Sequence, residues 1–390
     1  MGALSHIKVL DLSRVLAGPW ASQILADLGA EVIKVERPVC GDDTRGWGPP
    51  FLPDEQGGIT AESAYFLCAN RGKRSVCIDM KSAQGQKNIR QLARQSDVVI
   101  ENFKVGGAAA FGLDYATLSA DNPGLVYCAI TGFGQNGPLK DRPGYDFLVQ
   151  AMGGLMSITG QPEGEPGAGP QKVGVALTDI MTGLYATIGI LAALAERDRS
   201  GRGQFVDLAL LDVTAATLAN QASNYLVGGV VPTQLGNKHP NIVPYQSFVA
   251  ADGQLIVAVG NDTQFVSYTE ALGVGELASD DRFATNSARV TNRDSLVPLL
   301  QAKMLERKKD DWLRILEAAG VPAGPINTID EVFAEPQIQA RQMQVEMVHS
   351  SNSKLQLVGN PIKLSRTPVR YSRPPPTLGE HTQEVLAELA

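Results

Sequence analysis

Two predicted strands joined by one short helix open the chain, and they constrain its fold more than any other feature. Residues 6–12 (HIKVLDL) and 31–36 (EVIKVE) are typical of buried strands. Between them, Gly18 and Pro19 suit the first turn of a helix, and Gly29 suits its C-terminal end. Strands connected in this way lie parallel, with a right-handed crossover. The pattern therefore predicts an open α/β sheet.

The same alternation continues along the chain. Helical periodicity covers residues 81–95 and recurs near 212–226. Further strands are predicted at residues 97–100, 125–130 and 204–210. In open α/β sheets, ligands bind beyond the carboxyl ends of the strands. That rule points to three loops, at residues 13–18, 37–41 and 101–104.

The chain changes character near residue 228. A hairpin is predicted over residues 245–259, followed by amphipathic helices such as 310–318. We therefore expect three parts, which are the first part of a large domain, a smaller α+β domain, and a C-terminal segment that returns to the large domain. Their residue ranges are 1–225, 226–323 and 324–390. The C-terminal segment shows few long periodic runs.

Charge and composition argue against several classes of protein. Lys+Arg number 34 against 41 Asp+Glu, which gives a net charge of −7 and no basic face for nucleic acid. No histidines have metal-ligand spacing, so no metal site is predicted. Cys40, Cys68, Cys77 and Cys128 lack the spacing of a zinc or redox pair. They favour small buried thiols in the reducing cytoplasm.

Residues 132–137 (GFGQNG) match the dinucleotide-binding pattern G-x-G-x-x-G. A dinucleotide site requires a helix to begin at the motif, so that its N-terminus faces the pyrophosphate. Residues 138–143 (PLKDRP) predict a loop instead, so we do not expect NAD binding. Neither G-x-S-x-G nor a P-loop motif is present.

Residues 173–194 form an apolar stretch long enough to span a bilayer, but it carries Asp179 and has no cationic flank before it. We expect a buried helix and no membrane partner. Two interpretations of Asp179 stay open. An N-cap is favoured by how often Asp caps helices. Alternatively, a carboxylate that is poorly solvated near a helix start suits a nucleophile.

Short motifs are spread along the chain at residues 9–12 (VLDL), 17–19 (AGP), 28–36 (LGAEVIKVE), 70–75 (NRGKRS), 101–103 (ENF), 132–134 (GFG), 201–204 (GRGQ), 361–363 (PIK) and 378–382 (LGEHT). Together they resemble the class III CoA-transferase family, which includes formyl-CoA transferase, the carnitine CoA-transferases and α-methylacyl-CoA racemase. The resemblance implies a large Rossmann-like domain, a small domain and an interlocked homodimer. It also implies acyl-CoA and a carboxylic acid as substrates, with no tightly bound cofactor, in the cytoplasm.

In that family, the aspartate at the position of Asp179 attacks the acyl-CoA thioester to form a mixed anhydride. CoA thiolate then gives an aspartyl-CoA thioester, and the acceptor carboxylate takes over. The resemblance therefore makes Asp179 the predicted catalytic residue. It implies that the following residues bind CoA: Val15, Leu16, Ala17, Arg37, Ile78, Asp79, Met80, Lys81, Asn102, Phe103, Lys104, Tyr145 and Asp146. Arg37 and Lys81 are cations that an acidic protein needs to hold CoA phosphates.

The chain departs from the family pattern in places. Leu16 stands where formyl-CoA transferase has a glutamine, and residues 238–242 (KHPNI) replace its run of glycines. Tyr145 stands where the racemase has a histidine, and a phenol is a poor base at neutral pH. A transferase is therefore favoured over a racemase or epimerase. A non-catalytic acyl-CoA-binding subunit is the alternative from another class.

Residues 12–19 (LSRVLAGP) resemble the glutarate-type members of the family. This implies succinyl-CoA as donor and a dicarboxylic acid of four to six carbons as acceptor. Arg14 lies in this stretch, and two roles are open for it. It either binds the distal carboxylate of a dicarboxylic substrate or forms a structural salt bridge.

Overall fold

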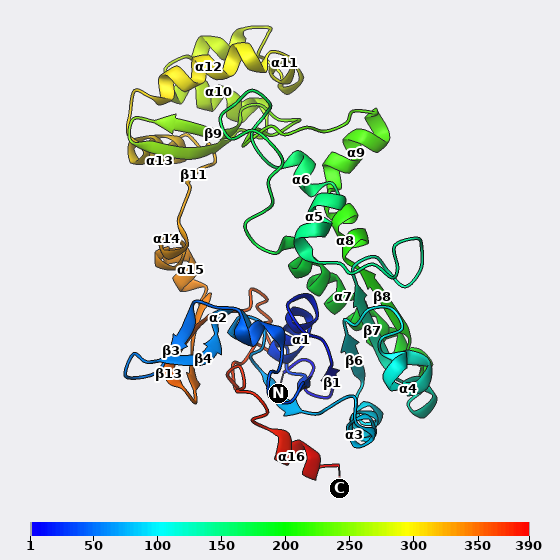
Figure 1. The fold of residues 1–390 in the computed structure, drawn as a ribbon. Coiled ribbons are helices and arrows are strands. Elements are labelled where there is room, and N and C mark those ends of the chain that lie inside the picture. The colour runs from blue at the N-terminus through cyan, green and yellow to red at the C-terminus, as the bar shows by residue number, and fades with distance from the viewer. Residues whose placement is uncertain (1, 390) are drawn as a thin grey trace. The chain divides into compact units, whose positions relative to one another are not determined.

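This computed structural model describes residues 2–389, which form two compact units (Figure 1). Unit 1 contains residues 2–156, 172–230 and 336–389, and unit 2 contains residues 157–171 and 231–335. The segment 157–171 belongs to unit 2, although nothing in its sequence separates it from the residues around it.

A six-stranded parallel sheet forms the centre of unit 1. In spatial order its strands are β5 (Lys73–Cys77), β2 (Glu31–Glu36), β1 (Lys8–Asp11), β6 (Val98–Glu101), β7 (Val126–Thr131) and β8 (Phe205–Ala209). Numbered within this sheet alone, the order is 3-2-1-4-5-6, that of a doubly wound Rossmann-like sheet. The predicted α/β class with a parallel sheet is confirmed. The order reverses between β1 and β6, where ligands bind in folds of this type.

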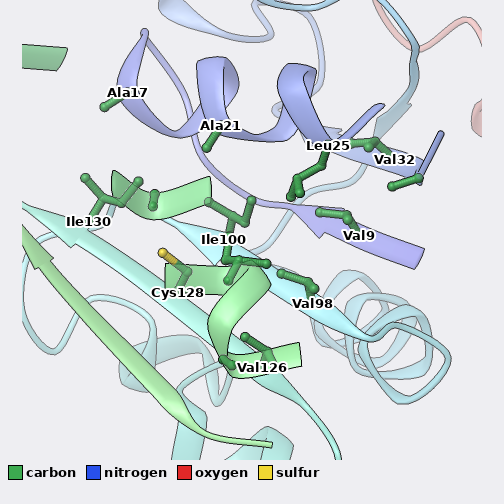
Figure 2. Close-up of a cluster of buried hydrophobic side chains, with 14 of the residues drawn as sticks. Val9, Ala17, Ala21, Leu25, Val32, Val98, Ile100, Val126, Cys128 and Ile130 are labelled. Carbon is green, nitrogen blue, oxygen red and sulfur yellow. The ribbon is translucent and has the colours of Figure 1, made fainter. Parts of the chain in front are cut away.

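The strands are apolar on both faces because each face is covered by helices. Val9 and Ile100 face α1 (Ala17–Asp27) and α7 (Leu177–Ser200), in the cluster drawn in Figure 2. Their chain neighbours Leu10 and Val99 face the other way, into a cluster with three further helices. These are α3 (Ala83–Arg94), α4 (Tyr115–Asp121) and α16 (Thr382–Ala387). This alternation produces the continuous apolar runs of the sequence, as parallel strands buried on both faces require.

Helix α7 is the one helix within residues 2–389 that is long and apolar enough to cross a membrane by length and composition. Its residues Ala186, Ile190 and Ala193 lie in the core against the sheet and α1. The core helix expected from residues 173–194 is therefore present, although it begins and ends later than predicted.

The remaining elements of unit 1 are short. The helices are α2 (Ala64–Leu67), α5 (Asp146–Met152), α8 (Leu210–Thr217), α9 (Ala219–Gly228) and α15 (Pro336–Ala340), with 3-10 helices η1 (Asp43–Gly46) and η2 (Ala109–Phe111). Two antiparallel hairpins are formed by β3 (Phe51–Pro53) with β4 (Ile59–Ser63), and by β12 (Gln344–His349) with β13 (Asn352–Val358). Helix α6 (Leu155–Ile158) spans the boundary of the two units.

Unit 2 has its own core around Phe248, Phe265 and Trp312. Its three-stranded sheet joins β9 (Tyr245–Ala250), β10 (Gly253–Ala258) and β11 (Ala323–Pro325). The helices are α10 (Asp262–Ala271), α11 (Asn286–Thr291), α12 (Arg293–Met304), α13 (Lys309–Ala318) and α14 (Ile329–Ala334), with the 3-10 helix η3 (Gly275–Ser279). The predicted hairpin and the predicted helix at 310–318 are confirmed.

Three expectations are corrected. The single helix expected near 212–226 is two helices, α8 and α9, because the chain turns at Ala219, where φ is +45°. The tail contains the β12–β13 hairpin, which its weak periodicity did not indicate. Cys128 is buried, but Cys40 and Cys68 are exposed, so burial does not account for all four free thiols.

Candidate active site

The loop between β1 and α1, residues 12–16, lies at the point where the strand order reverses. Side chains from outside the loop hold its backbone. The Asn102 side chain accepts the Arg14 N–H at 3.0 Å and donates to the Arg14 carbonyl at 2.6 Å. Val15 has φ of +72°, in the left-handed region that β-branched residues avoid. We call residues 12–16 the β1–α1 loop.

The N-terminus of α7 brings Asp179 to this part of unit 1. The helix begins at Leu177, so Asp179 is its third residue and is not its N-cap. The carboxylate that caps the helix comes from Asp146, whose Oδ1 accepts the N–H groups of Thr178 at 2.8 Å and Asp179 at 3.3 Å. Gln150, which is fully buried, donates to Asp146 Oδ2 at 2.7 Å. The N-cap interpretation of Asp179 is wrong, because a residue on another helix fills that role.

The Asp179 side chain is half-buried, and no group within residues 2–389 donates a hydrogen bond to its carboxylate. Burial raises the pKa of Asp179 to about 7, and the negative charge of Asp146 adds to the rise. A carboxylate with few hydrogen bonds and poor solvation is a stronger nucleophile than one in water.

Two cavities open at the carboxyl ends of the strands. The first, the Asp179 cavity, has a volume of about 520 Å³, and the second, the Arg37 cavity, has a volume of about 570 Å³. Arg14 and Phe103 line both of them, so the two cavities adjoin. Such a pair of cavities at a switch point can hold an extended ligand with one end at Asp179.

The cavities bring together the candidate residues from separate stretches of sequence. The Asp179 cavity is lined by Arg14, Val15, Leu16, Ala17, Asn102, Phe103, Lys104, Tyr145 and Asp179. The Arg37 cavity is lined by Arg14, Arg37, Ile78, Asp79, Met80, Lys81 and Phe103. Of the candidate residues, Asp146 lines neither cavity, because its carboxylate is turned toward the start of α7.

A shared carboxylate joins the two arginines of the site. Asp43 accepts from Arg14 Nη1 at 2.9 Å and from Arg37 Nη2 at 2.5 Å. All three side chains are substantially exposed, so each pair contributes at most about 1 kcal/mol. Of the two roles left open for Arg14, the structure shows the salt bridge, and this salt bridge is weak.

Sequence reasoning missed several residues of the Asp179 cavity. Lys140 and Arg142 add positive charge to its lining, and Trp47 adds an aromatic ring that packs edge-on against Tyr65. Lys140 and Arg142 lie in an irregular loop, which gives no periodic signal. Only the fold brings that loop to the end of β1.

The G-x-G-x-x-G match has a structural explanation that needs no dinucleotide. A Cβ on Gly132 would lie 2.5 Å from the Gly144 Cα, and a Cβ on Gly144 would lie 2.4 Å from the Gly132 Cα. The two glycines therefore allow the beginning and the end of the loop after β7 to lie in direct backbone contact. Both glycines line the Asp179 cavity. The next residues form turns and no helix, as expected.

The doubly wound sheet, with a carboxylate facing a cavity near its switch point, has the architecture of an α/β enzyme. The family model for CoA-transferase family III matches residues 4–382, and the chain belongs to that family. Among residues 2–389, no group of three or more side chains could hold a metal ion.

Similar proteins match over nearly the whole chain. The succinate–glutarate CoA-transferase of Agrobacterium fabrum is 53% identical over 99% of this chain and 95% of that protein. The human succinyl-CoA:glutarate CoA-transferase is 43% identical over 99% of this chain and 86% of that protein. A crystal structure of a CaiB/BaiF family protein from Brucella suis is 50% identical, with a TM-score of 0.87 and 100% of each chain covered. An Asp-to-Ala mutant of Rv3272 from Mycobacterium tuberculosis is 30% identical, with a TM-score of 0.86 and 99% of each chain covered.

Proposed function

We propose that this CoA-transferase moves CoA from succinyl-CoA to glutarate or another dicarboxylic acid of four to six carbons, through covalent intermediates on Asp179. The relatives named for transfer between succinate and glutarate support the choice of substrates. The Asp179 carboxylate carries the mechanism. It takes no hydrogen bond from residues 2–389, and it lines a cavity that adjoins a second one lined by cations.

The proposed reaction begins when a carboxylate oxygen of Asp179 attacks the thioester carbonyl of succinyl-CoA. The C–S bond breaks, CoA leaves as thiolate, and a succinyl-aspartyl anhydride forms. The thiolate then attacks the Asp179 carbonyl of the anhydride and releases succinate. Glutarate attacks the resulting aspartyl-CoA thioester and releases the thiolate again. Attack of the thiolate on the glutaryl carbonyl forms glutaryl-CoA and restores the Asp179 carboxylate.

CoA would occupy the Arg37 cavity, with its thioester reaching past Phe103 into the Asp179 cavity. Arg37 and Lys81 are suited to its phosphate groups, because a guanidinium binds two phosphate oxygens at once and an ammonium adds a point charge. Ile78 and Met80 offer apolar surface in the same cavity. Unit 1 would then be the CoA-binding domain.

Intact-protein mass spectrometry after mixing with succinyl-CoA tests the proposal. A covalent adduct should form, and glutarate should discharge it to give glutaryl-CoA and succinate in equal amounts. Butyrate, which has one carboxylate, is the matched control acceptor. CoA binding with neither an adduct nor exchange for any dicarboxylic acid would indicate a non-catalytic subunit. Inversion of a 2-methylacyl-CoA without acid exchange would indicate a racemase.

Arg14 gives a test of acceptor recognition, since we propose that it leaves Asp43 to bind the distal carboxylate of the acid. Replacing Arg14 by glutamine should raise KM for glutarate about 10- to 100-fold, which is the effect of losing a charge-assisted hydrogen bond. Transfer to butyrate should change much less. Arg94, whose exposed pair with Asp121 resembles that of Arg14 with Asp43, provides the control variant Arg94→Gln. An unchanged KM for glutarate in folded Arg14→Gln would leave the salt bridge as its only role.

We also propose the interlocked homodimer that the family resemblance implies, in the cytoplasm, which suits four free cysteines. Unit 1 exposes apolar side chains that a partner chain could cover. Ile188 on α7 is 61% exposed, and Leu226 and Val227 on α9 are 78% and 88% exposed. Sedimentation equilibrium should therefore give twice the chain mass of 41.5 kDa at micromolar concentration. A single-chain mass at that concentration would contradict the dimer.

A further inference from the structure

We propose that Lys34 and Asp42 act as positioning residues that hold the β1–α1 loop in a strained turn at Val15, so that residues 15–17 line the Asp179 cavity. This inference rests on the proposed function only in assigning a catalytic purpose to that cavity. Neither residue lines the Asp179 cavity. Both line the adjoining Arg37 cavity, where their charged atoms bind each other and the backbone of the β1–α1 loop.

The loop backbone is tied at three consecutive residues by side chains from other elements. Lys34, on β2, donates from its Nζ to the Ser13 carbonyl at 2.9 Å. Asn102 holds both backbone groups of Arg14. The Asp42 carboxylate accepts the Val15 N–H, at 3.2 Å from Oδ1 and 3.3 Å from Oδ2. The loop belongs to no helix or strand, and these side-chain hydrogen bonds therefore fix the conformation of its backbone.

The ion pair between Lys34 and Asp42 is buried and well supported. The two side chains are 1% and 0% exposed, and Nζ lies 2.9 Å from Asp42 Oδ2. Asp42 also accepts from the Thr44 N–H at 3.0 Å and the Thr44 hydroxyl at 2.8 Å, and its own N–H donates to Glu36 at 3.0 Å. Burial by itself would raise the pKa of Asp42, but the Lys34 ammonium and the Thr44 donors outweigh it and lower the pKa to about 2. Asp42 is therefore charged at every physiological pH.

Global stability does not explain this arrangement. A buried ion pair is often no better for stability than two apolar side chains of the same size. The strands β1 and β2 are already aligned by their own hydrogen bonds. The ion pair instead stabilises the left-handed turn at Val15. A backbone conformation of this kind costs about 1–3 kcal/mol and persists only where the surrounding structure enforces it.

The strain has a consequence for the reacting groups. If Val15 relaxed to a negative φ, the peptides of Leu16 and Ala17 would rotate and the wall of the Asp179 cavity would move. A displacement of about 1 Å in a reacting geometry costs about 100-fold in rate. The buried pair thus sets the wall against which the acyl group lies.

The test removes both charges together, because removing one would leave the other buried without its partner. Lys34 also faces the carboxylates of Asp11 and Glu36, which keep their ion pairs with Lys73 and Arg45. The variant Lys34→Met with Asp42→Leu should fold and should lower kcat about 10- to 100-fold. Both residues also line the Arg37 cavity, so kcat is compared at saturating succinyl-CoA, where weaker CoA binding alone does not lower it. Glu62→Gln is the matched control. Glu62 is a buried carboxylate that pairs with Arg45 and, within residues 2–389, makes no hydrogen bond or ion pair to residues 12–16, so kcat should not change.

Val15→Gly separates positioning from general damage, because glycine adopts a positive φ without strain. In the Val15→Gly background, removal of the Lys34–Asp42 pair should lower kcat several-fold less than it does when Val15 is retained. An equal loss in both backgrounds, or the same loss in Glu62→Gln, would overturn the proposal.

A second readout does not depend on transfer at all. Hydrogen exchange at the amides of residues 15–17 should quicken when the Lys34–Asp42 pair is removed and should stay unchanged in Glu62→Gln. Unchanged exchange in the pair-removed variant would defeat this inference even for an active enzyme. An absence of transfer in the wild-type protein would instead defeat the proposed function. The two failures are therefore distinguishable, and exchange also decides the matter if the variant is only marginally stable.

Discussion

Replacing Asp179 by asparagine is expected to abolish CoA transfer, with a loss of roughly 10⁴-fold or more in kcat. An amide of the same shape cannot form the anhydride, since its oxygen carries no negative charge and its nitrogen is a poor nucleophile. The fold should be preserved, because the Asp179 carboxylate takes no hydrogen bond within residues 2–389. Mass spectrometry with succinyl-CoA should show no covalent adduct on this variant.

Asp198→Asn is the matched control for this prediction. Asp198 lies on the same helix as Asp179 but is near the opposite end. The control variant should form the adduct and transfer CoA at the wild-type rate. If Asp179→Asn kept even a few per cent of wild-type activity, with its adduct on another side chain, the nucleophile would have to be sought elsewhere in the cavity.

The rate of adduct formation should rise with pH, with a midpoint at about pH 7 and a plateau above about pH 8, because only the ionised carboxylate attacks. Burial and then the charge of Asp146 raise the pKa of Asp179 to about 7, so at pH 6 about a tenth of the enzyme carries the nucleophile. The second-order rate constant for adduct formation, measured by stopped or quenched flow at subsaturating succinyl-CoA, reports the pKa of Asp179 in the free enzyme. A rate that stays flat from pH 5 to pH 8 would contradict the raised pKa.

The variant Asp146→Asn tests the cause of the shift. Asparagine keeps an oxygen that can accept the Thr178 N–H, loses the oxygen that accepts from Gln150, and removes the negative charge beside Asp179. Because a nearby negative charge raises the pKa of a carboxyl, its removal should move the midpoint of the pH profile to lower pH. A midpoint that did not move would assign the whole shift to burial.

The raised pKa also predicts a cost in stability. Asp179 has a pKa of about 7 in the folded protein against an ordinary value of 3.8, so its contribution to the free energy of unfolding falls as pH rises from about 4 to about 7. Asp179→Asn removes this penalty. It should therefore be more stable than wild type at pH 8, by a few kcal/mol at most, and equally stable at about pH 3.5. Urea unfolding at the two pH values would measure this difference.

Local sequence signals were sufficient to predict the strands and helices of the central sheet, but they did not predict the strained turn in the β1–α1 loop. The strand over residues 31–36 and the helix ending near Gly29 follow from apolar spacing and one glycine, which act within a few residues of each other. The left-handed turn at Val15 has no such signal, because valine disfavours that conformation and Asp42, 27 residues away, enforces it. Tertiary contact decides this part of the site.

The same limit applies to Asp179. Its position near a helix start suggested a cap, since caps are usually supplied by the adjoining residue. Here the cap comes from Asp146, which lies 33 residues earlier and reaches α7 only because α5 packs beside it. Spacing cannot reveal a cap supplied in this way. The family resemblance, which draws on motifs along the whole chain, predicts Asp179 as the nucleophile, a role that spacing alone did not favour.

Helix α7 carries Asp179 in its first turn, and its C-terminal end is held in place by contacts with the rest of unit 1. Arg197 binds Asp97 at 2.8 Å, Gly201 ends the helix in a left-handed turn, and Gly203 follows so tightly that a Cβ there would lie 2.0 Å from the Leu125 carbonyl. The 24 residues of this helix make a rod about 36 Å long. Arg197 and Asp179 are 18 residues apart on this helix, which is roughly 27 Å. Since Ala186, Ile190 and Ala193 are packed in the core between these two points, the helix links Asp179 to the opposite edge of the sheet as one stiff element.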